Sequence, residues 1–375
     1  MINQERLVQE FIEMVKIDSL SKQEGKFAAY LKEKLIKLGL EVFIDEQAGQ
    51  RAGSDTGNLV GRLQGKRKGV PVILFSAHMD TVPLGVGIQP QIREGAIYSS
   101  GKTILGSDDK AGIAIILEAL RHIQEEKIEH GGIEVLFTIG EEAGLLGSRY
   151  LDYSLLQAEM GFVLDSDGVP GTIICQAPAH ERINAVIYGK AAHAGMNPED
   201  GVNAIQVAAR AINKMNLLRI DEETTANIGV IKGGEVTNIV CERVILEGEA
   251  RSLSEERLCQ QIRHMVNCLQ EACDQMGACL EVKTRREYPV FKLEEAEPII
   301  KIAREAAKFL GLEVNVTSSG GGSDTNYFSA HGLKTVNLGI GMSQAHTTEE
   351  FIKIKDLVMS AHYVAEIIQQ VARSE

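Results

Sequence analysis

The 375-residue sequence has no long apolar run, since none approaches the roughly 18 residues that a membrane-spanning helix needs. Its first residues carry neither a basic segment nor a following apolar core, so we expect no signal peptide and a cytoplasmic protein. Basic residues are also scarce: 39 Lys and Arg stand against 52 Asp and Glu, a formal net charge of −13. Because such a surplus repels polyanions, we expect neither nucleic acid nor a membrane as a partner.

The six cysteines form no CxxC pair, and the sequence contains no internal repeat or low-complexity segment. Three of the cysteines fall in one expected helix, 254–278, and a fourth follows directly at position 279, which indicates reduced thiols packed as small apolar groups. What the chain does have is length, because 375 residues can form two domains with a sizeable core.

Hydrophobic spacing predicts an α/β protein with an inserted second domain. Before residue 178 we expect helices at 4–18, 24–38 and 113–123 and strands at 40–45, 58–64, 71–78, 133–139 and 161–164. The pattern then changes to strands at 183–190, 226–232 and 242–250 with helices at 201–216 and 254–278. The pattern then returns to that of the first segment, with a strand at 335–339 and helices at 297–310 and 355–372. We expect one domain of residues 1–180 and 288–375, interrupted by an α+β domain at 181–287.

Three of the expected buried strands end in side chains that can bind a metal. The apolar run 72–75 leads to His78 and Asp80, which point to the same side of an extended chain because they are two positions apart. The strand at 133–139 leads to Glu141 and Glu142, and the strand at 161–164 leads to Asp165. Ligands of open α/β sheets bind at the carboxyl ends of the strands, so we expect these side chains to meet there.

These side chains, with Asp108 and His346, are oxygen and imidazole donors without a thiolate. Such a set suits catalytic zinc, or cobalt or manganese in its place, better than a closed structural site. Taken singly, a polar strand end or a Glu-Glu pair is more often a solvated surface. Carboxylates that converge at one edge would repel one another strongly, however, and two divalent cations would relieve that repulsion.

Hydrolytic sites with two metals place the ions about 3.5–4 Å apart, a span that one bridging carboxylate can hold. A general base must then accept a proton from the attacking water. Glu141 and Glu142 suit these two tasks, because neighbouring side chains diverge on an extended backbone. One can bind metal while the other faces the water.

Five segments in this order resemble the signature of the co-catalytic di-zinc exopeptidases: His78-Met-Asp80, Gly106-Ser-Asp-Asp-Lys-Ala-Gly112, Glu141-Glu142, Asp165 and Ala345-His346. That family includes peptidase T, aminoacylase and succinyl-diaminopimelate desuccinylase, and residues 101–114 are most similar to the peptidase T branch. The resemblance covers essentially the whole chain. It implies a three-layer αβα catalytic domain with an inserted, ferredoxin-like α+β lid.

The resemblance also implies roles for the residues at the strand ends. His78 and Asp165 would hold one zinc ion, Glu142 and His346 the other, and Asp108 would bridge the two. By the same likeness Asp80 orients His78, and Glu141 is the base that activates the water. A cis peptide bond between Asp108 and Asp109 is implied as well.

In the inserted domain, His193 resembles the lid histidine that reaches the scissile carbonyl, although a lone His between small residues is more often just a loop residue. Asn238 and Arg251 match substrate-contacting positions of the family, and a surface ion pair is the alternative for Arg251. Gly321 and Asn326, in the late Gly-rich segment, are further candidates for substrate binding. The alternative for this segment is a tight turn before a helix that begins at Ser323.

The resemblance favours a metal-dependent aminopeptidase that acts on short peptides such as tripeptides. An amidohydrolase that deacylates N-acyl amino acids would use the same metal chemistry, and a binding protein without catalysis is the remote alternative. Peptidase T carries an Arg where this chain has Ser319, which leaves tripeptide specificity open. The lid could also pair two copies into a homodimer.

Overall fold

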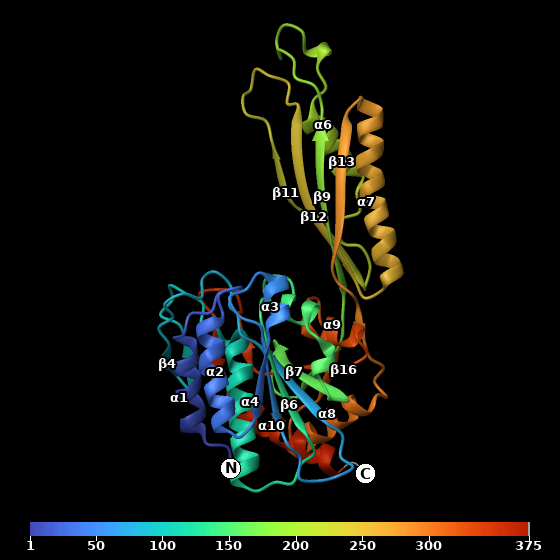
Figure 1. Cartoon of the computed structure of the whole chain (residues 1–375). Helices are drawn as coiled ribbons and strands as arrows, with labels where there is room; N and C mark the ends of the chain where they lie inside the picture. The colour runs from blue at the N-terminus through green and yellow to red at the C-terminus, as the bar shows by residue number, and fades with distance from the viewer. Residues whose placement is uncertain (374–375) are drawn as a thin grey trace. The chain divides into compact units, whose positions relative to one another are not determined.

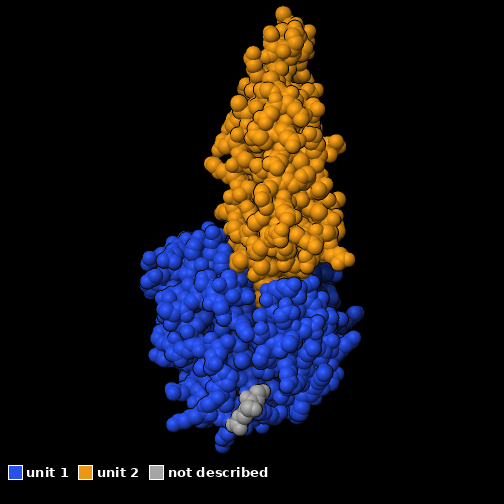
Figure 2. Space-filling model, turned by 90° about the vertical axis from the view of Figure 1, so that its right-hand side faces the viewer, with its two compact units in different colours: residues 1–176, 292–319, 323–375 blue, residues 177–291, 320–322 orange. Residues whose placement is uncertain are grey.

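The computed structural model describes residues 1–373, which fall into two compact units. The first unit comprises Met1–Gln176, Lys292–Ser319 and Ser323–Glu375, and the second comprises Ala177–Phe291 with Gly320–Gly322 (Figure 2). The sequence-based division into 1–180 with 288–375 and 181–287 differs from this one by a few residues at each crossing. The short glycine segment 320–322, assigned by sequence to the first domain, makes its contacts with the second unit.

Within the described residues, the first unit is built on a nine-stranded sheet in the order β1-β2-β6-β3-β7-β16-β8-β14, with β15 paired to β8 (Figure 1). Its strands are β1 (Glu41–Asp45), β2 (Asn58–Leu63), β3 (Ile73–His78), β6 (Ile133–Thr138), β7 (Met160–Ser166), β8 (Thr172–Ala177), β14 (Phe291–Lys292), β15 (Asn315–Ser318) and β16 (Lys334–Gly339). A small antiparallel sheet joins β4 (Gln91–Arg93), β5 (Ala96–Tyr98), β17 (Met342–Ser343) and β18 (Phe351–Lys353).

The central strands of the large sheet run parallel: β3 pairs with both β6 and β7, and β7 pairs with β16. Their carboxyl ends therefore meet at one edge, where the polar residues predicted from the sequence follow. Every residue of β3 and β6 is buried, which explains why apolar residues predominate in these strands.

Apolar side chains on both faces of the sheet are buried beneath helices. Leu74 and Val163 join a cluster that includes Phe328, whereas Phe75 and Phe162 point to the other face because neighbouring strand residues alternate. The helices are α1 (Gln4–Val15), α2 (Gly25–Lys37), α3 (Glu46–Ala52), α4 (Ser107–Glu125), α5 (Leu146–Tyr150), α8 (Pro298–Phe309), α9 (Asp324–Ala330) and α10 (Ile354–Arg373). The arrangement is the expected three-layer α/β fold.

The second unit has the β-α-β-β-α-β order of ferredoxin-like folds, with β10 as an added edge strand. Its antiparallel sheet has the order β10-β11-β12-β9-β13, and α6 and α7 bury one face in a shared apolar cluster. The elements are β9 (Ala179–Tyr188), α6 (Ala204–Lys214), β10 (Leu218–Arg219), β11 (Thr224–Gly233), β12 (Arg243–Ser252), α7 (Glu255–Met276) and β13 (Cys279–Tyr288). The α+β expectation is confirmed.

Candidate metal centre

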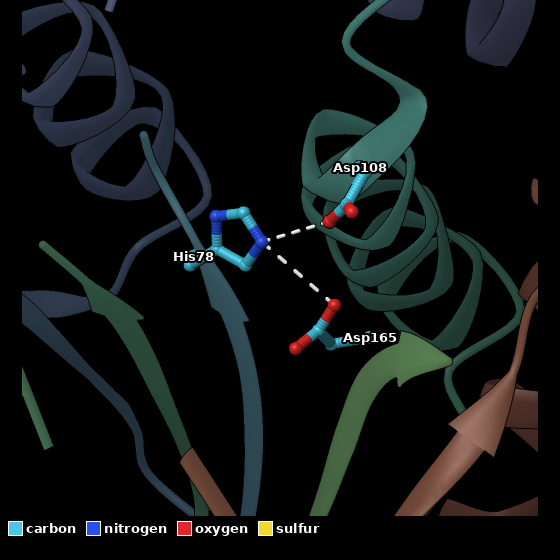
Figure 3. A group of neighbouring side chains, drawn as sticks. All are labelled: His78, Asp108 and Asp165. Atoms are coloured by element: carbon cyan, nitrogen blue, oxygen red, sulfur yellow. Dashed lines mark hydrogen bonds and ion pairs between the residues drawn. The ribbon is translucent and has the colours of Figure 1, made fainter. Parts of the chain in front are cut away.

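His78, the last residue of β3, is 1% exposed and faces two carboxylates from other elements. Its Nε2 atom lies 2.8 Å from Oδ1 of Asp108 and 3.7 Å from Oδ1 of Asp165 (Figure 3). Asp165 comes from the end of β7. The side chain of Asn337 on β16 accepts a hydrogen bond from the Asp165 N–H at 3.0 Å and donates one to the Asp165 carbonyl at 2.7 Å. One imidazole and two carboxylate oxygens thus converge, close enough to share one ion.

A second group forms around His346, which lies between β17 and β18. Its Nε2 atom is 2.6 Å from Oε1 of Glu142 and 3.1 Å from Oδ2 of Asp108. Asp108 therefore presents one carboxylate oxygen to His78 and the other to His346, which is the geometry of a bridging ligand. The ligand atoms within each group lie within 4.8 Å of one another.

Asp108 reaches this position from the first turn of α4. The helix was expected to begin near residue 113, but it begins at Ser107, because the polar residues Ser107 to Lys110 are buried rather than in an exposed loop. Gly106 enters the helix with a φ of 73°, a conformation that glycine adopts without steric strain. The peptide bond between Asp108 and Asp109 is cis, as the resemblance implied.

Glu141 lies in the turn after β6 and is half-buried. With His78 and Glu142 it forms a third group of possible ligands. Burial and the neighbouring Asp165 carboxylate raise the pKa of Glu141 well above its usual range. A carboxyl group with a raised pKa is suited to hold a proton near neutral pH.

The carboxylates of the centre lie close enough to repel one another, and this affects their pKa values. Burial raises the pKa of Asp165 well above its ordinary value. Burial acts in the same direction on Asp108, but hydrogen bonds from His346 and His78 outweigh it and hold the pKa of that carboxyl low. Within residues 1–373, the ion pairs of His78 and His346 connect them to Asp108, Asp165, Glu142 and Asp80. Several carboxylate oxygens beside two imidazole groups form a donor set that fits a pair of divalent cations.

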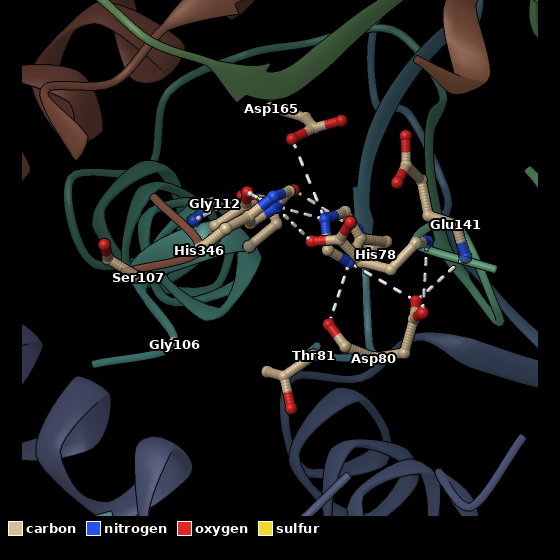
Figure 4. Close-up of polar contacts among 12 residues, drawn as sticks. His78, Asp80, Thr81, Gly106, Ser107, Gly112, Glu141, Asp165 and His346 are labelled. Atoms are coloured by element: carbon tan, nitrogen blue, oxygen red, sulfur yellow. Dashed lines mark hydrogen bonds and ion pairs between the residues drawn. The ribbon is translucent and has the colours of Figure 1, made fainter. Parts of the chain in front are cut away.

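Asp80 contacts both His78 and the turn that carries Glu141 and Glu142. Its main-chain oxygen, at 2.9 Å, accepts the hydrogen bond from Nδ1 of His78, whereas its carboxylate lies 3.4 Å from that atom. The carboxylate accepts hydrogen bonds from the main-chain N–H group of Glu141 (Figure 4) and from that of Glu142. It also accepts a hydrogen bond from the hydroxyl of Ser21. Asp80 thus fixes both His78 and the turn that carries the two glutamates.

In the second unit, His193 and Asn238 lie on adjacent segments, joined by the main-chain hydrogen bond from Ala194 to Asn238. The His193 side chain is exposed, and its Nδ1 atom accepts from the N–H groups of Gly195 and Met196, both at 3.1 Å. In the neutral imidazole the proton must then be on Nε2, which makes Nε2 a hydrogen-bond donor.

Arg251 lies at the opposite end of the same sheet. It forms an ion pair with Glu249 at 3.0 Å, the alternative considered above, and donates to the carbonyl of Gly320 at 3.4 Å. Along β9, the residue paired with Arg251 is His180, and Tyr188 marks the other end, near His193. Eight residue steps of about 3.3 Å place these ends about 26 Å apart. The structure therefore does not bring all the predicted substrate contacts of this unit together.

The late Gly-rich segment divides between the two units. Gly321 belongs to the stretch grouped with the second unit, where Gly322 donates to the Tyr288 hydroxyl at 3.1 Å. Asn326 is buried, and its side-chain oxygen accepts from the N–H of Ser323 at 3.0 Å. The helix that begins here is α9, so the alternative of a capped turn describes the local structure, and substrate contact at Gly321 and Asn326 stays a prediction.

Several buried residues beside the centre were not predicted from the sequence as part of the site. Glu24 accepts the N–H of Gly140, next to Glu141, and Glu350 accepts hydrogen bonds from the segment that carries Asp108. Both are acidic residues in polar surroundings, which in a sequence are indistinguishable from exposed ones. The sequence feature that could have indicated a role for Glu350 is its position, four residues after the candidate ligand His346.

Comparison with known proteins agrees with this geometry. The model of peptidase family M20/M25/M40 matches residues 74–370. The chain belongs to this family. The crystal structure of aminopeptidase PepT from Bacillus cereus ATCC 10987 is 46% identical, with 99% of each chain covered and a TM-score of 0.94. A tripeptidase from Staphylococcus aureus subsp. aureus Mu50 is 44% identical over the whole of both chains, with a TM-score of 0.97. Peptidase T of Clostridium botulinum (strain Kyoto / Type A2) is 27% identical and covers 97% of this chain and 98% of its own.

The family membership accounts for the fold and for the order of the polar segments along the chain. Among residues 1–373, no helix has the length and apolar character to cross a bilayer.

Proposed function

We propose that this protein is a dinuclear metal-dependent aminopeptidase that removes the N-terminal residue of short peptides, with tripeptides as the first candidates. The observation that carries the proposal is the position of Asp108, whose two carboxylate oxygens face His78 on one side and His346 on the other. The aminopeptidase and tripeptidase structures at 46% and 44% identity support the same reaction.

The donor set would hold two divalent ions, zinc first and cobalt or manganese as substitutes. His78 and Asp165 would bind one, Glu142 and His346 the other, and Asp108 would bind both. When bound, such ions supply a Lewis acid for the scissile carbonyl and lower the pKa of the attacking water.

Glu141 is the proposed general base. It would accept a proton from the attacking water and then deliver it to the departing amine. Its half-buried position beside Glu142 suits both transfers, because the carboxylate is partly shielded from solvent yet accessible to the reacting groups. Asp80 would keep Glu141 in place through the main-chain N–H.

The second unit would supply contacts to the substrate. The Nε2–H group of His193 is a suitable donor for the developing oxyanion, and Asn238 on the adjacent segment could bind the substrate main chain. The guanidinium of Arg251 could bind the C-terminal carboxylate of a peptide in place of Glu249. Backbone groups at Gly321 and the side chain of Asn326 are the remaining candidates.

A panel of substrates tests this proposal. Tripeptides, dipeptides and N-acyl amino acids would be assayed with the metal-loaded enzyme and with the enzyme after chelation. We expect peptides with a free N-terminus to be cleaved, only by the metal-loaded enzyme. Preferential hydrolysis of N-acyl amino acids would instead identify a deacylase, and full activity after exhaustive chelation would contradict the metal mechanism.

We also propose a cytoplasmic location, because all six cysteines are free thiols and suit a reducing compartment. The homodimer through the lid stays a prediction.

A further inference from the structure

Glu350 has no part in the proposed chemistry, yet it is completely buried. It lies four residues after His346 in the sequence. Its carboxylate accepts four hydrogen bonds. Oε2 accepts from the main-chain N–H groups of Leu105 and Gly106 at 2.8 and 2.9 Å. Oε1 accepts from the Ser107 hydroxyl at 2.5 Å and from the main-chain N–H of Asp108 at 3.1 Å. A carboxylate has about four acceptor positions, so all of them are used here.

These bonds join two segments that are 242 to 245 residues apart in the sequence. One delivers the proposed bridging ligand Asp108, and the other delivers His346. The contact between Nε2 of His346 and Oδ2 of Asp108, at 3.1 Å, closes a ring from Glu350 through Asp108 and His346 back to Glu350.

His346 lies in the loop between β17 and β18, outside the paired residues of these strands. Gln344 and His346 have φ values of 55° and 66°, in the left-handed region that costs a non-glycine residue about 1 kcal/mol or more. Thr347 closes a local turn with Gln344 by main-chain and hydroxyl hydrogen bonds. A strained ligand loop needs an anchor outside itself, and the hydrogen bonds that Glu350 accepts from residues 105–108 provide one.

We infer that Glu350 is a positioning residue for the dinuclear centre: by binding the 105–108 segment from the His346 loop, it sets the separation of Asp108 and His346 before any ion binds. The inference rests on the proposed function, because it concerns the same metal centre. It assigns Glu350 no contact with substrate or ions. Its effect on catalysis passes through the geometry of the two ligands.

The test is metal binding by Glu350→Gln. The amide replaces one acceptor oxygen with an NH₂ group that faces N–H or O–H donors, so at least one buried donor loses its partner. We expect the affinity for both ions to fall by about 10–100-fold, as for other groups that support metal ligands. Affinity would be measured by competition with a chelator. The visible spectrum of the cobalt-loaded protein would report the change in ligand geometry.

Glu134→Gln is the matched control. Glu134 is also a buried carboxylate, and it accepts from the main-chain N–H groups of Gln157 and Ala158 and from Arg62, near the start of β6. This end of the strand is opposite to the one that leads to Glu141. We expect Glu134→Gln to lower the melting temperature while its metal affinity and cobalt spectrum stay those of the wild type.

If Glu350→Gln does not fold, Ser107→Ala decides the question, because it removes one of the four donors and leaves the carboxylate in place. We expect a smaller fall in metal affinity, of a few-fold, and a shifted cobalt spectrum. Wild-type affinity and spectrum in the folded variant would overturn the inference. The wild-type protein is titrated first, so that absence of metal uptake there is recognised as failure of the proposed function rather than of the role of Glu350.

Discussion

The Oδ1 atom of Asp80 accepts the main-chain N–H of Glu141 at 2.9 Å. The proposed base is therefore fixed through its backbone, while its side chain stays half-buried and able to face a water molecule. The same carboxylate binds the N–H of Glu142 at 3.2 Å, so one buried acid orients a proposed ligand and the base together. This relationship leads to the first prediction.

Asp80→Asn should lower kcat without removing the metals. An amide offers one acceptor oxygen, so one of the two N–H groups of the turn or the Ser21 hydroxyl must face an NH₂ group. We expect kcat to fall by about 10–100-fold, the range found for residues that orient a metal centre. Steady-state kinetics with metal analysis checks this. Ser21→Ala removes one donor only and should have a smaller effect, and an unchanged kcat in Asp80→Asn would show that the turn is held by other contacts.

Glu141→Gln separates general base from metal ligand. An amide of the same shape cannot accept the proton, so we expect kcat to fall by about 10²–10⁴-fold. Two ions per chain should remain bound, because all five proposed ligands are intact. Stopped assays and metal analysis of the same sample give both quantities. Loss of an ion from this variant would make Glu141 a ligand, as its group with His78 and Glu142 allows, and full activity would remove it from the mechanism.

Substitution of the ligands should change the metal content in steps. Asp108 belongs to two ligand groups, whereas His346 belongs to one. We therefore expect His346→Ala to retain one ion per chain and Asp108→Ala to retain none at the same chelator concentration. Metal analysis after gel filtration is the measurement, and circular dichroism controls for folding. Equal losses in the two variants would contradict a bridging Asp108.

The residues at the ends of β3, β6 and β7 could be predicted because buried parallel strands leave a strong pattern of apolar runs followed by polar residues. The supporting residues could not. Glu350 acts on main-chain N–H groups more than 240 residues away, and main-chain partners leave no trace in the side-chain sequence. The polar first turn of α4 has the composition of an exposed loop, and only its tertiary surroundings bury it.

Strand β13 was missed for a related reason. Most of its side chains lie outside the buried core, so the alternation of Leu280 and Val282 with polar residues is short and weak. Its place is fixed by pairing with β9, from Cys279 opposite Tyr188 onward, which is a long-range contact. Hydrophobic pattern specifies burial, and edge strands carry less of it.

Lys110 should make stability depend on pH. It is fully buried, its Nζ atom donates to the carbonyl of Ile17 at 2.6 Å and lies 4.7 Å from the Phe27 ring centroid. Burial lowers the pKa of Lys110 to about 7, from 10.5 for the ordinary side chain. Between these values the unfolded chain holds a proton that the folded chain lacks, so the free energy of unfolding rises with pH.

Within this pH range, the free energy of unfolding rises by at most about 1.4 kcal/mol per pH unit. Lys110→Met removes the group, so the difference in unfolding free energy between the two proteins should change with pH across this range. Urea unfolding at several pH values from 7 to 10 provides the data. Parallel curves for wild type and Lys110→Met would mean that Lys110 stays charged when folded.

His193 and Arg251 mark opposite ends of the second unit's sheet, about 26 Å apart along β9. In Figure 1 the segment after β9 lies at the far end of that unit from the start of the strand. An extended tripeptide spans only about 10 Å. One peptide held by Arg251 therefore cannot reach His193 of the same chain, and if both residues act on one substrate, His193 must come from a second copy.

Mixing two inactive variants tests this consequence. Glu141→Gln lacks the base, and His193→Ala lacks the proposed oxyanion donor. In a homodimer with shared sites, a mixed pair contains one site with both wild-type residues. Random exchange should then restore about a quarter of the wild-type activity, because half of the dimers are mixed and half of their sites are intact. Each variant alone, incubated under the same conditions, is the control. If the mixture stays as inactive as its components, His193 does not act across copies, and Arg251 and His193 cannot both contact the substrate.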